Sequence, residues 1–574
     1  MRILLLVHAF NSLSQRIHAE LRRDGHEVSV EFDISDAVTE EAVALWQPEV
    51  IVAPFLKRKV PETVWRQVPT LIVHPGPPGD RGPNALDHAI LRGEPTWGVT
   101  VLQAVAEYDA GPIWAYRTFA MRPARKADLY RREVTEAAVD AVREALARLA
   151  RGEVPEPAPR GVFRPALTAT QRTIDWASTT TEAILRLANA SDGAPGVVAP
   201  LLGKRCRLFD LHPEAEAHCA EPGMVIGRRD EALLVATRDG AVWVGQVRQE
   251  GGVKLPALVA FPEAAAYPEI PGNGYWEASQ PTWQEIAYRE TGAVGFLTFR
   301  FYNGAMSTAQ CQRLLAALRW AFARPTRVLV LAGGTGFWSN GIHLHVIEAA
   351  ERPADASMAN IEAIDDVAEA LIRHSGQITV AALEGNAAAG GCFLARACDF
   401  VWVRQGVVLN PHYKNMGNLY GSEFWTYLLP KRLGDAGTAQ LMAHRLPILG
   451  EEAVALGFYD AVLPSDGFAA SVRQEAQRLA DDAAAVTAFL ARKAALRAAD
   501  EAVRPLAEYR RHELEAMANN FYGFDPAYHV ARYHFVHRTP HSWTPLHLAR
   551  HRQVGYRREG APNRAQRQSL FMEV

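Results

Sequence analysis

Residues 71–82 read LIVHPGPPGDRG, three strand-forming residues that run directly into a histidine and then into a loop of proline and glycine. Three other short apolar runs precede this stretch, at Arg2–Val7, Glu27–Phe32 and Val50–Phe55, with helical patterns between them. Short strands that alternate with helices predict a parallel, doubly wound α/β sheet. Because ligands in such sheets bind beyond the carboxyl ends of the strands, we expect His74 to lie where chemistry takes place.

The composition is that of a globular protein with several domains. Its 574 residues exceed the roughly 250–300 at which single cores stop growing, and 48% of them are hydrophobic and 22% charged. The 61 Lys and Arg side chains nearly balance the 64 Asp and Glu, which gives a net charge of −3. Such a chain has no overall field that would attract nucleic acid or an anionic membrane, so a local cluster must hold any anionic ligand.

Cysteine usage and the apolar runs favour a cytoplasmic protein. The first apolar run is only a strand long and lacks a signal-peptide cleavage site, and no window approaches the ~20 apolar residues of a membrane span. The cysteines are odd in number and lack paired metal-ligand spacing, so we expect them to be reduced and buried. They are Cys206, Cys219, Cys311, Cys392 and Cys398.

Changes in composition divide the chain into four segments. The proline-rich stretch Pro155–Pro165 separates an α/β segment, residues 1–155, from residues 165–270, whose short strands and charged turns predict a small β-rich, OB-like domain. Residues 285–465 again alternate strands with helices and predict a second α/β unit. Residues 466–574 read as a helical segment that packs over that unit.

The loop after His74 belongs to a larger set of residues suited to formyl transfer. Arg81-Gly82 ends the loop, and Gly98-Val99-Thr100 and Asp109-x-Gly111 follow. Transfer of a formyl group needs a polariser for the carbonyl oxygen and a proton acceptor for the nucleophile, and a histidine with a carboxylate near it supplies both. The spacing lets His74 and Asp109 meet.

These residues resemble the folate-dependent formyltransferases over about the first 150 residues. Their pattern is Asn-x-His-x-Ser-Leu-Leu-Pro-x-x-Arg-Gly followed by Gly-Val-Thr and Asp-x-Gly, and the stretch from Thr173 to Gly223 is similar to their smaller carboxyl-terminal domain. The resemblance implies that His74 and Asp109 are catalytic. The family's asparagine falls at Ile72, which cannot hydrogen-bond an oxyanion, and the replacement of Ser-Leu-Leu by Gly-Pro-Pro indicates a different acceptor.

Three further polar residues are candidates for binding the folate beside His74. Arg81 belongs to the resembling pattern, and Asn84 and Gln15 are polar positions expected near the same face of the sheet.

A second constellation lies in the other α/β unit. Residues 337–344 read FWSNGIHL and residues 384–392 read EGNAAAGGC. Glycines that open a helix after a strand leave backbone N–H groups exposed at its positive end, where two of them can stabilise the oxygen of a thioester as negative charge develops. The sequence therefore predicts an oxyanion hole near Gly390-Gly391.

Residues 290–465 resemble the crotonase (enoyl-CoA hydratase/isomerase) superfamily, whose motifs Phe-Ser-x-Gly-x-Asp-Leu and Ala-x-Gly-Gly-Gly line up with these two runs. The resemblance implies that the amides of Ile342 and Gly390 are the oxyanion donors. The two catalytic glutamates of the hydratases are replaced by Phe393 and His412. Since hydration of a double bond needs that acid–base pair, a simple hydratase is disfavoured.

The order of these units resembles the HypX (also called HoxX) family of hydrogenase maturation factors over nearly the whole chain. The resemblance implies formyl transfer from 10-formyltetrahydrofolate to coenzyme A, and then decarbonylation of formyl-CoA to carbon monoxide, an iron ligand of [NiFe]-hydrogenase. It also implies Glu423 as base, Tyr413 as proton donor and other hydrogenase maturation proteins as partners. Burial of Glu423 in its apolar stretch would raise its pKa, which suits a base near neutral pH.

The phosphates of coenzyme A need cations or hydroxyls, for which Arg131, its neighbour Arg132 and Ser191 are candidates. The C-terminal histidines have no carboxylate on their helical face and no metal-ligand spacing, so we expect no metal there. They are His529, His534, His537, His541, His547 and His551.

Two alternative functions remain open from the sequence. One is a formyltransferase that acts on an amine or a nucleotide sugar, with a crotonase half that acts on an unrelated acyl-CoA. The other is a non-catalytic scaffold in hydrogenase maturation, which the losses at Ile72 and Phe393 favour and the retained His74, Asp109 and Glu423 oppose.

Overall fold

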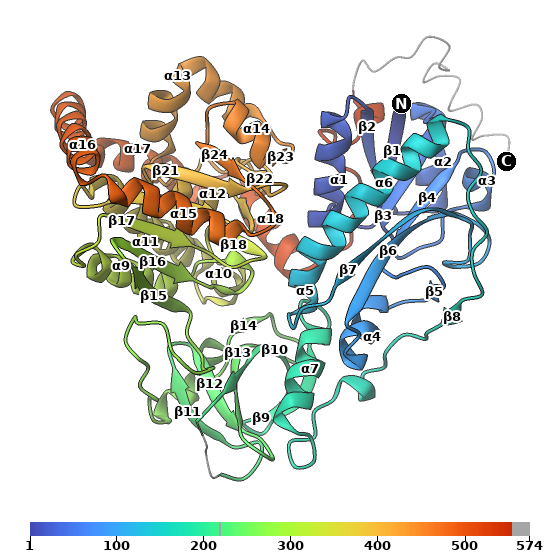
Figure 1. The fold of residues 1–574 in the computed structure, drawn as a ribbon, viewed down its shortest axis with the longest axis horizontal. Coiled ribbons are helices and arrows are strands. Elements are labelled where there is room, and N and C mark those ends of the chain that lie inside the picture. Colours follow the sequence, from blue (N-terminus) through green and yellow to red (C-terminus); the bar gives the residue numbers. More distant parts are fainter. Residues whose placement is uncertain (217–219, 554–574) are drawn as a thin grey trace.

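The structure is a computed structural model that describes residues 1–216 and 220–553. Figure 1 shows three sheet-containing units: a first α/β unit, a small β-rich unit that bridges the other two, and a second α/β unit covered by the C-terminal helices. This is the multidomain α/β architecture that the sequence predicts. Of the five cysteines, Cys219 lies outside the described residues, and the other four are free and buried.

The first sheet has the strand order β2-β1-β3-β4-β6-β7. Its strands are β1 (Arg2–Val7), β2 (Glu27–Phe32), β3 (Val50–Phe55), β4 (Thr70–His74), β6 (Thr96–Gln103) and β7 (Ile113–Ala120). The first four are parallel, as predicted, whereas β6 is antiparallel to β4 and to β7. The sheet therefore has an antiparallel edge beyond the four predicted strands, where the loop of residues 104–112 turns the chain back and β7 pairs antiparallel with β6.

Both faces of this sheet are buried. Ile3 and Leu5 of β1 pack in the core formed by α1 (Ser12–Arg23) and α6 (Thr135–Ala150), while Leu4 contributes to the opposite core with α2 (Asp36–Trp46). Burial on both faces explains why β1 is an unbroken apolar run rather than an alternating one. Shorter helices complete the unit: α3 (Glu62–Trp65), α4 (Ala85–Arg92), α5 (Lys126–Leu129) and the π-helical turn η1 (Tyr130–Val134).

The β-rich unit is an antiparallel sheet with the order β11-β12-β13-β10-β9, and the short β14 pairs with β13. Helix α7 (Thr181–Ser191) precedes the sheet and packs against it through Ile184 and Ala188. The strands are β9 (Val197–Leu201), β10 (Lys204–Glu214), β11 (Val225–Arg229), β12 (Ala232–Ala236), β13 (Ala241–Gln249) and β14 (Leu255–Pro256).

The second α/β unit contains two sheets. The larger has the order β15-β16-β17-β19-β21-β24 and is parallel except at the β15–β16 hairpin; the smaller has the order β18-β20-β22-β23. The larger sheet comprises β15 (Ile286–Thr291), β16 (Val294–Phe299), β17 (Val328–Ala332), β19 (Ile378–Leu383), β21 (Phe400–Arg404) and β24 (Ala461–Leu463). The smaller comprises β18 (Phe337–Ser339), β20 (Asn386–Ala388), β22 (Val408–Asn410) and β23 (Ile448–Leu449). The main helices are α9 (Thr308–Phe322), α10 (Leu344–Ala349), α11 (Pro353–Arg373), α12 (Gly390–Arg396), α13 (Trp425–Ala443) and α14 (Gly450–Ala455).

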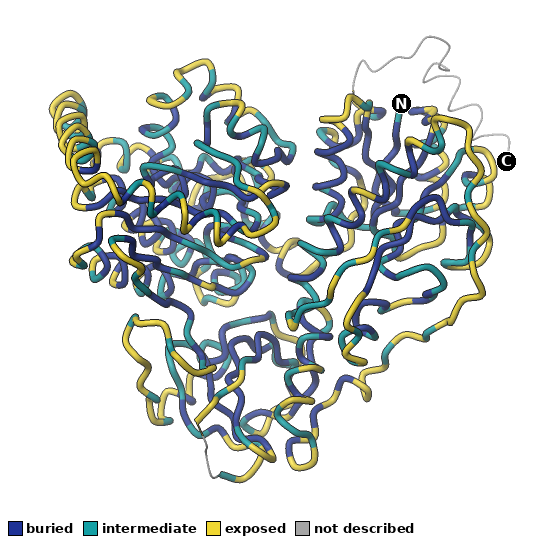
Figure 2. The backbone as a smooth tube through the Cα atoms, viewed as in Figure 1, coloured by how far each residue is buried: buried dark blue, intermediate teal, exposed yellow. Residues whose placement is uncertain are grey.

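The C-terminal helices cover the second α/β unit, but the chain then returns to the first unit (Figure 1). Residues 544–552, the C-terminal strap, lie along edge strand β2: the N–H of Val30 donates to the carbonyl of Leu548 at 3.1 Å, and the N–H of Phe32 donates to Thr544 Oγ1 at 2.8 Å. His551 is fully buried there beside Glu31, at 2.9 Å. The expectation that the terminal segment only covers the second unit is thus incomplete. The helices are α15 (Phe468–Asp481), α16 (Ala483–Val503), α17 (Leu506–Tyr522) and α18 (Ala527–His537), of which α16 is the most exposed (Figure 2).

Helix α1 of the first unit docks on the smaller sheet of the second. Asn410 Nδ2 donates to Gln15 Oε1 at 2.9 Å, Arg16 donates to the carbonyl of Gly406, and Ala19 packs with Val408 and Leu449. The two α/β units therefore contact each other directly as well as through the β-rich unit.

Within residues 1–216 and 220–553, no helix is both long and apolar enough to cross a membrane, and no group of three or more His, Cys, Asp or Glu side chains could hold a metal ion. Of the C-terminal histidines, His529 contacts the carbonyl of Phe521, His537 contacts Glu348 and His551 contacts Glu31.

Candidate active sites

His74 is the last residue of β4, at the carboxyl edge of the first sheet, and its side chain is 5% exposed. Its Nε2 lies 2.8 Å from Asp80 Oδ2, and its Nδ1 lies 3.4 Å from Asp109 Oδ1. The structure therefore brings His74 and Asp109 together, and it adds a second carboxylate that the sequence did not single out. A side chain at position 76 would collide with this pair, since a Cβ on Gly76 would lie 2.5 Å from both His74 Nε2 and Asp80 Oδ2.

The two carboxylates favour a charged imidazole. Burial lowers the pKa of His74, but hydrogen bonds and charge attraction from Asp109 and Asp80 outweigh burial and raise the pKa to about 9. The pKa of Asp109 moves the other way: burial raises it, while His74, the N–H of Gly82 and Arg81 hold it below its usual value. At neutral pH the site thus presents an imidazolium, whose positive charge can stabilise an oxyanion.

Local backbone geometry places both carboxylates. Asp109 has a left-handed conformation with φ 51°, and its Oδ2 accepts a hydrogen bond from the N–H of Gly82 at 3.0 Å. Gly111 lets this loop approach β6, because a Cβ there would lie 1.7 Å from the carbonyl oxygen of Gln103. Asp80 pairs with Arg164, which lies on the chain segment that leads to the β-rich unit.

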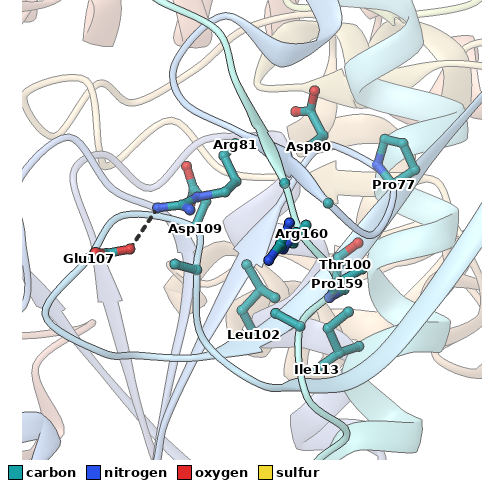
Figure 3. A pocket seen from close by; sticks show the side chains of 14 residues that line it. Pro77, Asp80, Arg81, Thr100, Leu102, Glu107, Asp109, Ile113, Pro159 and Arg160 are labelled. Atoms are coloured by element: carbon teal, nitrogen blue, oxygen red, sulfur yellow. Dashed lines mark hydrogen bonds and ion pairs between the residues drawn. The ribbon is translucent and has the colours of Figure 1, made fainter.

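A cavity of about 400 Å³ opens in front of this site (Figure 3). Asp80, Asp109 and Arg81 line it, and Arg81 forms an ion pair with Glu107 at 3.0 Å. The segment from Ala158 to Gly161 crosses the cavity and closes one side. The proline-rich stretch that predicted a domain junction is therefore also a wall of the site.

The other candidate folate-binding residues, Asn84 and Gln15, are not among the residues that line this cavity. Asn84 precedes α4 in a left-handed conformation, and its Oδ1 accepts from the N–H of Leu167. Gln15 contacts Asn410 of the second α/β unit. Ile72, at the position of the missing asparagine, packs against the core beneath the sheet.

The second candidate site forms where α12 begins. Helix α12 starts at Gly390, and the loop with Gly341 lies against it, since a Cβ on Gly341 would be 3.3 Å from the nitrogen of Gly390. Ile342 follows Gly341 and bridges to Met306. The two predicted oxyanion donors, Ile342 and Gly390, therefore lie on adjoining backbone segments.

Glu423 and Tyr413 meet at the start of this helix. Tyr413 Oη donates to Glu423 Oε2 at 2.5 Å, and both side chains are buried. The other carboxylate oxygen lies over Gly390, where a Cβ would come within 2.0 Å of Glu423 Oε1. Burial raises the pKa of Glu423 to about 7, against the hydrogen bonds from Tyr413 and Ser422 that lower it, and burial and Glu423 raise the pKa of Tyr413 well above its usual value.

The residues at the two lost glutamate positions have other roles. Phe393 is fully buried and stacks on the ring of Tyr413, with centroids 5.1 Å apart. His412 is 6% exposed, neither of its ring nitrogens has a hydrogen-bond partner, and burial lowers its pKa to about 4. A neutral imidazole of that kind supplies no general acid near pH 7.

A larger cleft, of about 1050 Å³, is lined by residues of all three units. Arg131 lies in it, over the ring of Phe337 at 4.2 Å and 3.3 Å from Asn303 Oδ1. Its neighbour Arg132 pairs with Glu384 at 2.6 Å. The hydroxyl of Ser191, by contrast, is fully buried and accepts a hydrogen bond from Arg172 at 2.9 Å.

Two cations that the sequence did not reveal converge on Gly193, beside the three-unit junction. Lys254 and Arg538 each donate to the carbonyl of Gly193 at 3.3 Å, and neither forms an ion pair with any described residue. Burial lowers the pKa of Lys254 to about 8. They come from segments 284 positions apart in the sequence, so no local pattern could have joined them.

The fold and the two sites define a formyltransferase-like protein joined to an enoyl-CoA hydratase-like protein. Family models agree: residues 33–146 match Formyl transferase, residues 166–261 match Formyl transferase, C-terminal domain, and residues 294–544 match Enoyl-CoA hydratase/isomerase.

Two relatives match the whole arrangement. The hydrogenase maturation factor HoxX of Bradyrhizobium diazoefficiens is 53% identical over 96% of this chain and 97% of its own length. The crystal structure of HypX from Aquifex aeolicus in complex with tetrahydrofolic acid is 48% identical, with a TM-score of 0.95 over 97% of this chain and 100% of that one. A methionyl-tRNA formyltransferase of Roseiflexus castenholzii is 30% identical over 31% of this chain and 57% of its own length. The chain belongs to the HypX/HoxX family of hydrogenase maturation factors.

Proposed function

We propose that this protein makes carbon monoxide for [NiFe]-hydrogenase maturation in two steps: formyl transfer from 10-formyltetrahydrofolate to coenzyme A, then decarbonylation of formyl-CoA. The observation that carries the proposal is the pairing of Glu423 and Tyr413 over Gly390. It provides one base and one proton donor beside an oxyanion site, which is what decarbonylation needs, whereas the two glutamates that hydration needs are absent. The four buried free thiols fit a reducing compartment such as the cytoplasm.

In the first step, the thiol sulfur of coenzyme A attacks the formyl carbon of the folate. The charged His74 stabilises the oxyanion that forms, and Asp109 accepts the thiol proton. Collapse of the tetrahedral intermediate breaks the bond from carbon to the folate nitrogen, which leaves with a proton. The raised pKa of His74 keeps the imidazole charged at neutral pH, and the lowered pKa of Asp109 keeps its carboxylate ionised and free to accept a proton.

In the second step, Glu423 removes the hydrogen on the formyl carbon as a proton. The C–H electron pair stays on carbon as the lone pair of carbon monoxide, while the C–S electron pair leaves with sulfur. Tyr413 provides the proton that the departing thiolate takes up, and the amides of Ile342 and Gly390 hold the thioester oxygen until the C–S bond breaks. The raised pKa of Glu423, about 7, suits a base at neutral pH.

Coenzyme A takes part in the reaction at both centres. Arg131 in the large cleft, and Lys254 and Arg538 beside Gly193, offer charges of the right sign for the phosphates. Gln15, at the contact between the two α/β units, is a polar candidate for the pantetheine arm.

The experiment is to incubate the purified protein with 10-formyltetrahydrofolate and coenzyme A, and to detect carbon monoxide in the headspace with a haem protein. Carbon monoxide that depends on coenzyme A and disappears in Glu423→Gln, with formyl-CoA accumulating, supports the proposal. Glu515→Gln is the matched control, because Glu515 is an exposed glutamate of α17. If the wild-type protein forms neither formyl-CoA nor carbon monoxide, the two-step proposal is wrong.

The same assay separates the alternatives. A formyltransferase for an amine or a nucleotide sugar would consume 10-formyltetrahydrofolate only when such an acceptor replaces coenzyme A. A non-catalytic scaffold would support hydrogenase maturation unchanged when it carries Glu423→Gln. The buried His74–Asp109 and Tyr413–Glu423 pairs favour the catalytic reading over the scaffold.

A further inference from the structure

The backbone that presents Glu423 is conformationally strained. Glu423 and the next residue, Phe424, both adopt the left-handed region, with φ 61° and 60°. This region is uncommon for residues other than glycine, and two such residues in succession persist only where the surroundings hold them. The strain aims the Glu423 side chain at the start of α12, since its Oε1 lies over Gly390.

Two buried carboxylates from other helices accept hydrogen bonds from the backbone of this turn. Asp365 Oδ1, on α11, accepts a hydrogen bond from the N–H of Glu423 at 2.8 Å. Glu513 Oε2, on α17, accepts one from the N–H of Phe424 at 2.9 Å, and its Oε1 accepts from the N–H and the hydroxyl of Thr426. Both carboxyl groups are fully buried. Burial of an acidic side chain is costly unless its hydrogen bonds compensate.

We propose that Asp365 and Glu513 are positioning residues for decarbonylation, which together clamp the Glu423–Phe424 turn and so fix the Glu423 carboxylate over Gly390. This inference rests on the proposed function, in which Glu423 is the base. It also assigns a role to α17, which lies beyond the sheets of the second α/β unit and supplies Glu513.

The charges around the clamp agree with this role. Burial raises the pKa of Glu513 to about 8 and that of Asp365 well above its usual value, and Glu423 adds to both shifts. A carboxyl group that takes up a proton still accepts an N–H hydrogen bond through its carbonyl oxygen, and it then adds no negative charge beside the base. The other titratable groups that face Glu423 or the clamp are Tyr413, Cys311 on α9, Cys392 on α12 and Arg510 on α17.

The test compares variants that keep or remove the acceptor oxygen. Asp365→Leu and Glu513→Leu leave an amide of the turn without its partner, and a base misplaced by about 1 Å is expected to lower kcat for decarbonylation on the order of 100-fold. Formyl transfer at His74 is expected to continue, so formyl-CoA accumulates. Asp365→Asn keeps the carbonyl oxygen that accepts from Glu423 and is expected to rescue carbon monoxide formation, whereas Glu513→Gln keeps only one of two bonded oxygens and is expected to rescue it in part. Asp366→Asn is the matched control, because Asp366 is the exposed neighbour of Asp365.

If Asp365 and Glu513 only stabilised the fold, their leucine variants would lower formyl transfer and decarbonylation together, and the amide variants would not restore decarbonylation selectively. That result overturns the inference. Failure of the proposed function is distinguishable, because the wild-type protein would then form no carbon monoxide. In that case crystal structures of the leucine variants decide: a Glu423 carboxylate that stays over Gly390, with φ unchanged at Glu423 and Phe424, refutes the clamp. A carboxylate that moves away supports it. Melting temperatures show whether each variant is folded.

Discussion

Asp80 lies 2.8 Å from Nε2 of His74, on the opposite side of the imidazole from Asp109, so a carboxylate faces each ring nitrogen. A neutral imidazole has one N–H and can donate to only one of them, whereas an imidazolium donates to both. The site is therefore built for the charged form. Of the two carboxylates, Asp80 is the one that a comparison with formyltransferases would not have identified.

The first prediction concerns this second carboxylate. Asp80→Asn removes one of the charges that raise the pKa of His74, and we expect that pKa to fall by about 1–3 units. The alkaline limb of the pH profile for formyl transfer should move down by the same amount. NMR titration of His74 measures the shift directly. Glu107→Gln, in an exposed residue of the same cavity, is the control and should leave the titration in place; an Asp80→Asn variant with an unchanged His74 titration would contradict the prediction.

The second prediction concerns the pH dependence of the stability of the fold. The pKa of His74 is raised from 6.5 to about 9 in the folded protein, so protonation of His74 stabilises the fold fully below pH 6.5. This contribution, about 3 kcal/mol, is lost as the pH rises through 9. Urea unfolding at pH 6.5 and pH 9.5 measures it. In His74→Gln the decrease in the free energy of unfolding between the two pH values should be smaller by that amount, whereas equal decreases in both proteins would refute the assignment.

The third prediction concerns the contact between Gly390 and Glu423. A methyl group at position 390 would lie 2.0 Å from Glu423 Oε1, so Gly390→Ala must displace the carboxylate. We expect decarbonylation to fall by 100-fold or more, since the base leaves the oxyanion site, while formyl transfer at His74 is retained. Coupled assays of formyl-CoA and carbon monoxide check this. Gly272→Ala, where a Cβ would make only ordinary contacts at 3.6 Å, serves as the control.

The sequence predicts the strands of both α/β units well because buried parallel strands are short apolar runs. The expected strands at Arg2–Val7, Glu27–Phe32 and Val50–Phe55 have the same bounds in the structure. The antiparallel edge of the first sheet was not predicted, because strands β6 and β7 were not identified from the sequence. Strand direction depends on the connection between strands, not on the residues within them.

Some contacts within the two candidate sites could be predicted from the sequence, and others could not. His74 with Asp109, and Tyr413 with Glu423, could be predicted to meet, because each pair lies within 35 positions and within a recognisable pattern. Asp365, 58 positions before Glu423, carries no local signal of its hydrogen bond to the turn. The sequence also gave no sign that the hydroxyl of Ser191 is occupied by Arg172 inside the β-rich unit, or that Gln15 faces the second α/β unit.

The C-terminal strap supplies the fourth prediction. Glu31 of β2 is fully buried and bonds to three strap residues: its oxygens lie 2.9 Å from His551 Nε2 and 2.6 Å from Arg552 Nε, and Thr544 donates to it as well. Burial raises the pKa of Glu31, but the bonds from His551, Thr544 and Arg552 more than offset burial and lower it. The charged form of Glu31 is therefore part of what holds the strap.

Glu31→Gln removes that charge and leaves Arg552 and His551 without their buried partner, which is expected to cost about 3 kcal/mol in the free energy of unfolding. The strap should loosen from the edge of the sheet, so the amides of Val30 and Phe32, which donate to strap residues, should exchange with deuterium faster. Glu41→Gln is the matched control: Glu41 also pairs with Arg552, but it is 39% exposed, and loss of an exposed pair costs about 1 kcal/mol or less. If both variants lose the same stability and leave exchange at Val30 and Phe32 unchanged, Glu31 does not anchor the strap.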